Sequence, residues 1–175
     1  MAHVQLGDQE AFGCLLDRHA TRLHAFLHRM IQNSADAEDL TQEAFLRVWR
    51  HADRWQPQRV KFTTWLYRIG HNLCIDRLRR RREVNVDEFP EPSSSDPTDD
   101  LDAERRSTLV KALIAELPER QRTALLLCHY QGLTNQQAAE VLDVSVDALE
   151  SLLARARRFL RERLAPWLEK EEADT

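Results

Sequence analysis

Arginines crowd one end of a basic segment at residues 61–82, which reads KFTTWLYRIGHNLCIDRLRRRR. Aromatic side chains lie near its other end. Such a pairing suits single-stranded DNA, because unstacked bases stack on aromatic rings for about 1 to 3 kcal/mol each while arginines neutralise phosphates. The segment also fits an ordinary helix, with Trp65, Leu66 and Ile69 in a core and the arginines in water. Its residues therefore leave two interpretations open: a DNA contact or a solvated basic helix.

A second segment, residues 133–160, has the pattern of a helix-turn-helix. It reads LTNQQAAEVLDVSVDALESLLARARRFL, with a short helix, a tight turn beginning at Asp143 and a longer helix. Helical spacing predicts that the longer helix buries Val146, Leu149, Leu153, Ala156 and Leu160. The opposite face carries groups that can reach base edges and phosphates, namely Glu150, Ser151, Arg155 and Arg158. The alternative is a solvated face in a packed three-helix unit.

A third segment, residues 36–50, predicts an amphipathic helix with the sequence DAEDLTQEAFLRVWR. Its buried stripe is expected to contain Ala37, Leu40, Ala44 and Val48. Its outer face would then carry Asp39, Gln42, Glu43 and Leu46. A leucine framed by carboxylates suits the docking of a basic partner helix, although single surface leucines are also ordinary.

Helices must position these residues, and the pattern predicts seven of them. Apolar residues recur at helical spacing over 11–31, 35–52, 62–82, 102–116, 119–130, 134–142 and 146–167. Helix starts and stops agree with this: Asn33, Ser34 or Asp36 can cap the second helix, and Trp55 to Gln58 break the chain before the third. Pro118 suits a helix start and Gly132 a turn. Because glycines number only four and alternating β-branched runs are few, the sequence predicts an all-α fold.

Residues 83–102 differ from the rest in composition. They read EVNVDEFPEPSSSDPTDDLD, with three prolines, three consecutive serines and no basic residue. Such a stretch cannot bury enough apolar surface to offset its ordering entropy, so it predicts a flexible acidic linker. At up to about 3.3 Å per residue, the linker would let two bodies stand tens of ångströms apart. We expect two small helical domains, 1–82 and 103–168, and an acidic tail, 169–175.

The formal net charge of −4 is distributed unevenly. Residues 1–82 carry 14 basic and 9 acidic side chains, residues 83–102 carry 0 and 8, and residues 103–175 carry 11 and 12. Charge acts over about 10 Å in 0.1 M salt, so the local balance matters more than the sum. A basic first body and an arginine cluster in the second can each meet DNA.

The chain has no sequence feature of a membrane or secreted protein. Its longest apolar run, residues 124–128, is far shorter than the roughly 20 residues of a membrane helix. The N-terminus has no basic-then-apolar signal pattern, and we expect a cytoplasmic protein without membrane insertion. Three widely spaced cysteines among apolar neighbours, Cys14, Cys74 and Cys128, are expected to be reduced core residues.

Histidine and cysteine pairs suggest a rival function, a metal or thiol sensor. The pairs are His24 with His28, His71 with Cys74, and Cys128 with His129. No set of four ligands has a recognised zinc spacing, so we expect neither metal nor cofactor. An enzyme has less support still, because no nucleophile–base pair, glycine-rich phosphate loop or carboxylate dyad stands out.

The chain resembles the extracytoplasmic-function (ECF) group of the sigma-70 family of RNA polymerase sigma factors. The resemblance is carried, in order, by DAEDLTQEAFLRVWR, FTTWLYRIGHNLCIDRLRRRR and LPERQRTALLLCHYQGLTNQQAAEVLDVSVDALESLLARAR. It spans nearly everything except the linker and the acidic tail. It implies a transcription initiation factor with no catalytic activity of its own.

The resemblance also implies roles for residues. The first domain would dock on the β′ clamp of core RNA polymerase through Asp39, Leu40, Gln42, Glu43, Phe45, Leu46 and Trp49. It would melt the minus-ten promoter element and hold a flipped base with Arg59, Lys61, Trp65, Arg68, His71, Asn72, Arg77, Arg79, Arg80 and Arg81. The second domain would sit on the β flap and read the minus-thirty-five element with Thr134, Gln136, Ser145, Asp147, Glu150, Ser151, Ala154, Arg155 and Arg158. The linker would thread toward the polymerase active-site cleft.

The predicted recognition helix departs from the usual family pattern. The family commonly has a basic residue where Glu150 stands, a glycine–threonine pair at Asp147 and Ala148, and an arginine at Leu152. The resemblance therefore implies that this helix binds DNA, but it does not imply which promoter sequence the helix recognises. The chain ends soon after the helix-turn-helix, with no appended sensory domain, so we expect control by a separate anti-sigma protein. The main alternative is a stand-alone helix-turn-helix regulator, which would explain residues 133–163 only.

Overall fold

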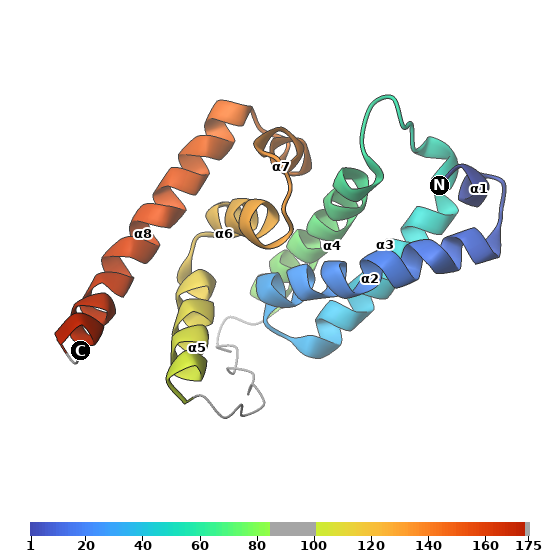
Figure 1. Ribbon diagram of the computed structural model, residues 1–175. Coiled ribbons are helices and arrows are strands. Elements are labelled where there is room, and N and C mark those ends of the chain that lie inside the picture. Colours follow the sequence, from blue (N-terminus) through green and yellow to red (C-terminus); the bar gives the residue numbers. More distant parts are fainter. Residues whose placement is uncertain (85–100, 174–175) are drawn as a thin grey trace.

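A computed structural model describes the backbone of residues 1–84 and 101–173. These residues form helices joined by turns and short loops, and no strand occurs among them. The predicted all-α fold with two helical domains is confirmed. Figure 1 shows α1 to α4 gathered in one bundle and α5 to α8 in another, with α4 of the first packed against α7 of the second.

The first domain consists of four α-helices and one short 3₁₀ turn. The bounds are α1 (Ala2–Gln5), α2 (Gln9–Ile31), α3 (Ser34–Arg50), η1 (Ala52–Arg54) and α4 (Phe62–Val84). The three predicted helices are present, with ends that differ by a few residues. The sequence did not predict α1 and η1, because elements this short are too brief to show a helical period.

Side-chain caps fix where the helices of the first domain begin. The Asp8 carboxylate accepts a 3.0 Å hydrogen bond from the backbone N–H of Ala11 at the start of α2. The Asn33 side chain likewise accepts from the backbone N–H of Asp36, at 2.9 Å, and begins α3. Each cap satisfies an N–H that has no partner within its helix.

The core of the first domain lies where α2, α3 and α4 meet. The predicted stripe of α3 is confirmed, since Ala37, Leu40, Ala44 and Val48 are all buried. Gly70 of α4 lets that helix approach α2 closely. A Cβ at this position would lie 2.8 Å from the Cδ1 atom of Leu23, so only glycine fits without a shift.

The second domain follows the predicted helix order with two differences. Its elements are α5 (Leu101–Glu116), α6 (Glu119–Leu125), the π-helical turn η2 (Leu126–Tyr130), α7 (Asn135–Leu142) and α8 (Val146–Ala173). The single helix predicted for 119–130 is thus α-helical only in its first half. The backbone N–H of Gln131 bonds to the Leu126 carbonyl five residues earlier, a π-type connection. Gly132 adopts φ +70° in the turn that follows, as its type predicted.

The helices extend into segments that the sequence assigned to linker and tail. Helix α4 includes residues 83 and 84, α5 begins at Leu101, and α8 continues to Ala173. The predicted linker therefore loses residues at both ends and the predicted tail most of its length. The remaining linker residues, 85–100, and tail residues, 174–175, lie outside the described part of the chain.

The two domains pack directly on each other. One continuous apolar cluster includes Tyr67 and Cys74 of the first domain and Ile114 and Leu117 of the second. The sequence predicted two helical domains joined by a flexible linker that would let them stand tens of ångströms apart. The structure instead joins their cores, because α4 packs on α7 and α2 packs on α5 and α6, while α2, α3 and α4 also pack on one another.

Candidate nucleic-acid interface

The second domain contains a helix-turn-helix made by α7, a tight turn and α8. Thr134 opens α7 with a capping box, in which its hydroxyl accepts from the Gln137 N–H and the Gln137 side chain accepts from the Thr134 N–H. Asp143 turns the chain with φ 53°. The Ser145 hydroxyl then accepts from the Ala148 N–H at 3.1 Å and starts α8. The predicted helix-turn-helix is therefore confirmed: a short helix, a tight turn and a longer helix follow one another in this segment.

Helix α8 separates its buried and outer faces as its spacing predicted. Leu149, Leu153 and Ala156 are buried, while Val146 and Leu160 are half-buried. The outer residues of the predicted DNA set are all exposed: Asp147, Glu150, Ser151, Ala154, Arg155 and Arg158. Of the set's other members, Thr134, Gln136 and Ser145 are also exposed. The set therefore forms a surface around the start of α7 and along α8.

Hydrogen bonds already engage further polar groups of this surface. The Asn135 amide donates to the Glu150 Oε1 atom at 3.2 Å and so ties the start of α7 to α8. The Ser151 hydroxyl donates to the Asp147 carbonyl at 3.0 Å. Asn135 is a functional candidate that sequence reasoning missed, because its partner lies 15 residues away on another helix.

The basic helix α4 divides its arginines between structure and solvent. Arg77 and Arg81, one turn apart, both form ion pairs with the buried Asp36 at the start of α3. Arg79 and Arg80 are exposed. Arg79 has a long ion pair of 3.8 Å with Glu83. The predicted DNA set therefore contains two arginines that also tie α4 to α3.

The start of α4 carries an aromatic cluster. The ring of Phe62 lies 6.4 Å from that of Trp65, 6.5 Å from that of Trp55 and 5.2 Å from that of His19. The Trp55 indole N–H donates to the Val60 carbonyl at 3.1 Å and fixes the loop before the helix. His19 had no sequence signal for this cluster, because it comes from α2.

Other members of the predicted minus-ten set lie in the loop before α4 and along that helix. Trp65 is half-buried, while Arg59, Lys61, Arg68 and Asn72 are exposed. His71 is half-buried, and its Nδ1 atom is enclosed without a hydrogen-bond partner. Burial lowers the pKa of His71, so the neutral imidazole is favoured.

The predicted polymerase set of α3 lies partly outside and partly inside the fold. Asp39, Gln42 and Leu46 are exposed, and Glu43 pairs with Arg47 at 2.8 Å. Leu40 and Phe45 are buried at 4% and 3% exposure, and Trp49 contacts Phe12 with the rings tilted by 57° and their centres 5.0 Å apart. A groove of about 420 Å³ joins this face to α4, where Asp76, Arg77 and Arg80 line it.

A second cleft brings parts of the two predicted DNA sets together. It has a volume of about 520 Å³ and lies between the domains. Arg59, Trp65 and Arg68 line it from the first domain, and Gln136 and Ser145 line it from the second. The arginines of α8, by contrast, do not line this cleft.

Comparison with known proteins decides the family. The family model "Sigma-70 region 2" matches residues 15–84, and "Sigma-70, region 4" matches residues 107–160. The chain belongs to the sigma-70 family. Its two matched regions coincide with the two helical domains, so the family resemblance inferred from the motifs is confirmed.

Curated relatives place this sigma-70 family member in the ECF group. It is 35% identical to the ECF RNA polymerase sigma factor SigE of Mycolicibacterium smegmatis. That match covers 91% of this chain and 65% of SigE. It is 32% identical to the ECF RNA polymerase sigma factor SigW of Bacillus subtilis, with 92% of each chain covered. It is 36% identical to the RNA polymerase sigma factor CarQ of Myxococcus xanthus over 94% of this chain and 95% of the other.

Two solved structures resemble the whole two-domain arrangement of this sigma-70 family member. CnrH in complex with the cytosolic domain of CnrY is 29% identical, with a TM-score of 0.74 over 94% of each chain. RpoE of Bartonella quintana in complex with the anti-sigma factor NepR is 26% identical, with a TM-score of 0.75 over 89% of this chain and 98% of the other.

The thiols and histidines of this sigma-70 family member were the candidate ligands for a metal. Within residues 1–84 and 101–173, no group of three or more metal-binding side chains gathers. All three cysteines are free, but the prediction that all are core residues is wrong for Cys14, which is exposed, and Cys128 is only half-buried. Burial raises the pKa of the Cys74 thiol to about 12. None of the helices in the described segments has the length and apolar character needed to cross a bilayer.

Proposed function

We propose that this ECF sigma factor binds core RNA polymerase in the cytoplasm and directs it to promoters, with no catalytic chemistry of its own. The observation that carries the proposal is the presence of both sigma-70 regions, in order, at 15–84 and 107–160. A stand-alone helix-turn-helix regulator would account for the second region and leave the first without a role. We assign residues 1–82 to polymerase and minus-ten contacts and residues 103–168 to the minus-thirty-five contact.

The outer face of α3 is the proposed polymerase contact. Its exposed residues, Asp39, Gln42 and Leu46, are available to a partner helix of the β′ clamp. Leu46 is 46% exposed, and covering it would remove apolar surface from water. Leu40 and Phe45 act in this proposal by holding α3 in place, because they are buried in the core.

The start of α4 and the loop before it are the proposed minus-ten contact. Trp65 offers a partly open ring on which an unstacked base can stack. Arg59, Lys61 and Arg68 are exposed cations close to that ring in sequence and can neutralise phosphates. The ion pairs of Arg77 and Arg81 with Asp36 would position these two side chains rather than free them for DNA.

The helix-turn-helix is the proposed minus-thirty-five contact. Arg155 and Arg158 are exposed on α8 and can donate hydrogen bonds to DNA phosphates or to the edge of a guanine base. Glu150 can accept a hydrogen bond from the amino group of cytosine. We infer a promoter preference particular to this chain, since an acidic residue stands where the family commonly has a basic one.

Control by an anti-sigma protein is the proposed regulation. The structure of the similar RpoE of Bartonella quintana contains the anti-sigma factor NepR bound to it. The structure of the similar CnrH likewise contains the cytosolic domain of CnrY. The likeness of fold to both supports a separate protein partner of this kind for the present chain.

Gel filtration with purified core polymerase tests the proposal. The chain is expected to co-elute with core, and Leu46→Asp is expected to weaken co-elution because it places a charge on the apolar contact. Leu16→Asp is the matched control, since Leu16 is an exposed leucine of α2 outside the proposed contact, at 37% exposure. A wild-type chain that never co-elutes would contradict the function. Equal binding by both variants would contradict the role of Leu46.

A further inference from the structure

The loop before α4, part of the proposed minus-ten contact, has the short helix α1 beside it. Helix α1 is four residues long, too short to be stable without tertiary contacts. Val4 anchors it, with 3% of its surface exposed, and α1 packs on both α2 and η1. Figure 1 shows α1 beside the end of α3, where η1 follows. Helix α1 therefore lies next to the segment that leads into the loop.

Gln5, the last residue of α1, connects that helix to the loop. Its side-chain Nε2 atom donates to the Ala52 carbonyl at 3.0 Å and to the Trp55 carbonyl at 2.9 Å. A glutamine amide has two N–H groups, so one side chain can serve both acceptors. The two carbonyls lie 47 and 50 residues later in the chain, at the start of η1 and directly after it. Gln5 therefore fixes the point at which the chain leaves η1.

Trp55 passes this restraint to the far end of the loop. Its carbonyl accepts from Gln5, and its indole N–H donates to the Val60 carbonyl at 3.1 Å. Between these ends, the backbone N–H groups of Arg59 and Val60 both donate to the Gln56 carbonyl, at 3.0 and 3.2 Å. The loop is thus closed into a compact turn, and Gln5 holds that turn from outside.

The side chains of this turn are open to a ligand. Gln56, Pro57, Gln58 and Arg59 are all exposed, and so is Lys61 just before α4. Amide and guanidinium groups can donate to the edge of an unstacked base, and amides can accept as well. The loop therefore carries groups that can distinguish one base from another, provided that its backbone keeps one position.

Position matters because base contacts depend closely on geometry. A binding group must stay within about 0.5 Å of its productive position, and loops keep such positions less well than helices unless neighbouring hydrogen bonds lock them. Phosphate contacts are less demanding, because Coulomb attraction falls gradually with distance. Loosening the loop is therefore expected to reduce discrimination between bases more than overall affinity for DNA.

We propose that Gln5 is a positioning residue for the minus-ten contact: its two hydrogen bonds to the Ala52 and Trp55 carbonyls keep the loop of residues 55–61 in the geometry that discriminates between bases. The inference rests on the proposed function for the role of this loop in DNA binding. Gln5 acts through the loop and makes no contact with DNA in this proposal. Because Gln5 is exposed, water can replace its hydrogen bonds, so its loss is expected to loosen the loop and leave the fold intact.

Substitutions at Gln5 separate hydrogen bonding from shape. Gln5→Met keeps the length of the side chain and removes both N–H groups. Gln5→Lys keeps a donor on a side chain of similar reach. Gln9→Met is the matched control, because Gln9 is an exposed glutamine at the start of α2. Trp55→Phe removes the indole N–H and keeps an aromatic ring, so it breaks the next hydrogen bond, the one to Val60.

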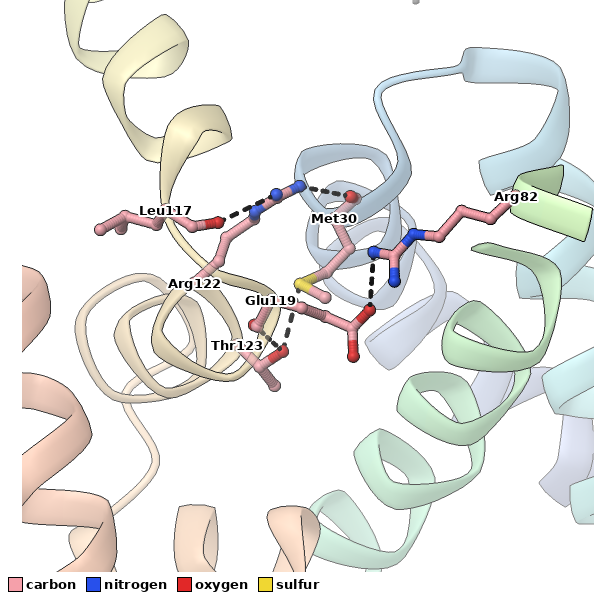
Figure 2. A network of polar contacts seen from close by, with 6 residues as sticks. All are labelled: Met30, Arg82, Leu117, Glu119, Arg122 and Thr123. Carbon is pink, nitrogen blue, oxygen red and sulfur yellow. Dashed lines mark hydrogen bonds and ion pairs between the residues drawn. The ribbon is translucent and has the colours of Figure 1, made fainter. Parts of the chain in front are cut away.

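A second control matches the loss of two hydrogen bonds to carbonyls. Arg122 of α6 donates from Nη1 to the Met30 carbonyl at 2.9 Å and from Nη2 to the Leu117 carbonyl at 3.1 Å, as Figure 2 shows. These acceptors lie outside the loop before α4. Arg122→Met therefore loses as many hydrogen bonds to the backbone as Gln5→Met, without touching the loop.

Hydrogen exchange of the full chain, followed by mass spectrometry, measures the loop directly. Peptides that cover residues 52–61 are expected to exchange several-fold faster in Gln5→Met and at nearly the wild-type rate in Gln5→Lys. Gln9→Met and Arg122→Met should leave exchange in these peptides unchanged. Wild-type exchange rates in Gln5→Met would overturn the proposal, since Gln5 would then not hold the loop.

Promoter selection by the holoenzyme measures the consequence for DNA, with a library randomised across the minus-ten element. The ratio between the preferred base and the others is expected to fall several-fold at one position or more in Gln5→Met and in Trp55→Phe, and to recover in Gln5→Lys. The added charge of lysine acts on all sequences alike, so it does not change this ratio. The double variant of Gln5→Met with Trp55→Phe should lose less than the two single losses combined, because both act on one loop.

Faster exchange without any loss of base discrimination would overturn the positioning role. An equal loss of discrimination in Arg122→Met would also overturn it, because general destabilisation would then explain the effect. Co-elution with core polymerase is scored on the same proteins, which separates the two proposals. If exchange follows the prediction while no protein binds core, the hold of Gln5 on the loop is supported and the proposed function fails.

Discussion

The Tyr67 hydroxyl of α4 donates a 2.6 Å hydrogen bond to the Oε1 atom of Gln131, which lies 64 residues later in the second domain. Burial raises the pKa of Tyr67 to about 12, so the phenol keeps its proton and remains a donor at neutral pH. The bond therefore joins the first domain to the second.

Tyr67→Phe is expected to lower the free energy of unfolding by about 1 kcal/mol, because the Gln131 carbonyl loses its donor while ring packing is kept. Urea denaturation measures this change. A double-mutant cycle with Gln131→Ala isolates the bond from other effects. A coupling energy near zero would show that the bond contributes nothing to the packing of the domains.

Asp36→Asn should destabilise the first domain. The substitution keeps the shape of the side chain but leaves Arg77 and Arg81 without their carboxylate partner. Because both arginines are about one-third exposed, water offsets part of the loss, and we expect roughly 1 to 3 kcal/mol in the free energy of unfolding. Thermal unfolding tests this, with the exposed Glu38→Gln on the same helix turn as control. Equal stability of the two variants would rule out a structural role for the pairs.

Glu150→Gln should change the base preference of the helix-turn-helix. The carboxylate, held by Asn135 at 3.2 Å, can only accept hydrogen bonds, whereas an amide can also donate. Good base contacts discriminate by about 1 to 3 kcal/mol, so the preferred base at one position should shift. Selection of promoters from a randomised library by the holoenzyme measures this, with Arg157→Gln on the same helix as control. An unaltered preference would place Glu150 away from the bases.

Stability should fall as the pH drops through about 6.5. Burial lowers the pKa of His71, with Arg120 acting in the same direction and Asn72 and Glu119 opposing it. The unfolded chain therefore binds a proton more readily than the folded one, and stability present above the unfolded pKa of about 6.5 is lost below it. His71→Gln should flatten the decline of Tm between pH 7.5 and 5.5. His129→Gln, at an exposed position, should not. An unchanged slope in His71→Gln would assign the decline to other groups.

Local patterns in the sequence were enough to predict the longer helices and the buried faces of α3 and α8. The stripe of Leu149, Leu153 and Ala156 is visible in the sequence because residues three and four apart share one helix face. Thr134 and Asn33 likewise cap helices by accepting from the backbone N–H three residues later, so a short stretch of sequence is enough to predict these caps. The family followed from several such segments occurring in order.

Contacts between distant residues escaped prediction. Asp36 was a candidate cap of α3 by its position, but its ion pairs come from residues more than 40 positions later. Arg122 reaches the Met30 carbonyl across 92 residues, and a backbone acceptor has no sequence signal at all. Cys14 was misplaced because apolar neighbours in the sequence do not show which face of α2 is turned to solvent.

Run-off transcription with purified core polymerase tests the central claim most directly, namely that this chain selects start sites for core. Core and the chain are mixed on a library of genomic promoter fragments, with core alone as the reference. Discrete transcripts that depend on the chain, and that weaken with Leu46→Asp but not with Leu16→Asp, are the predicted result. Transcripts that are the same with and without the chain would contradict the claim.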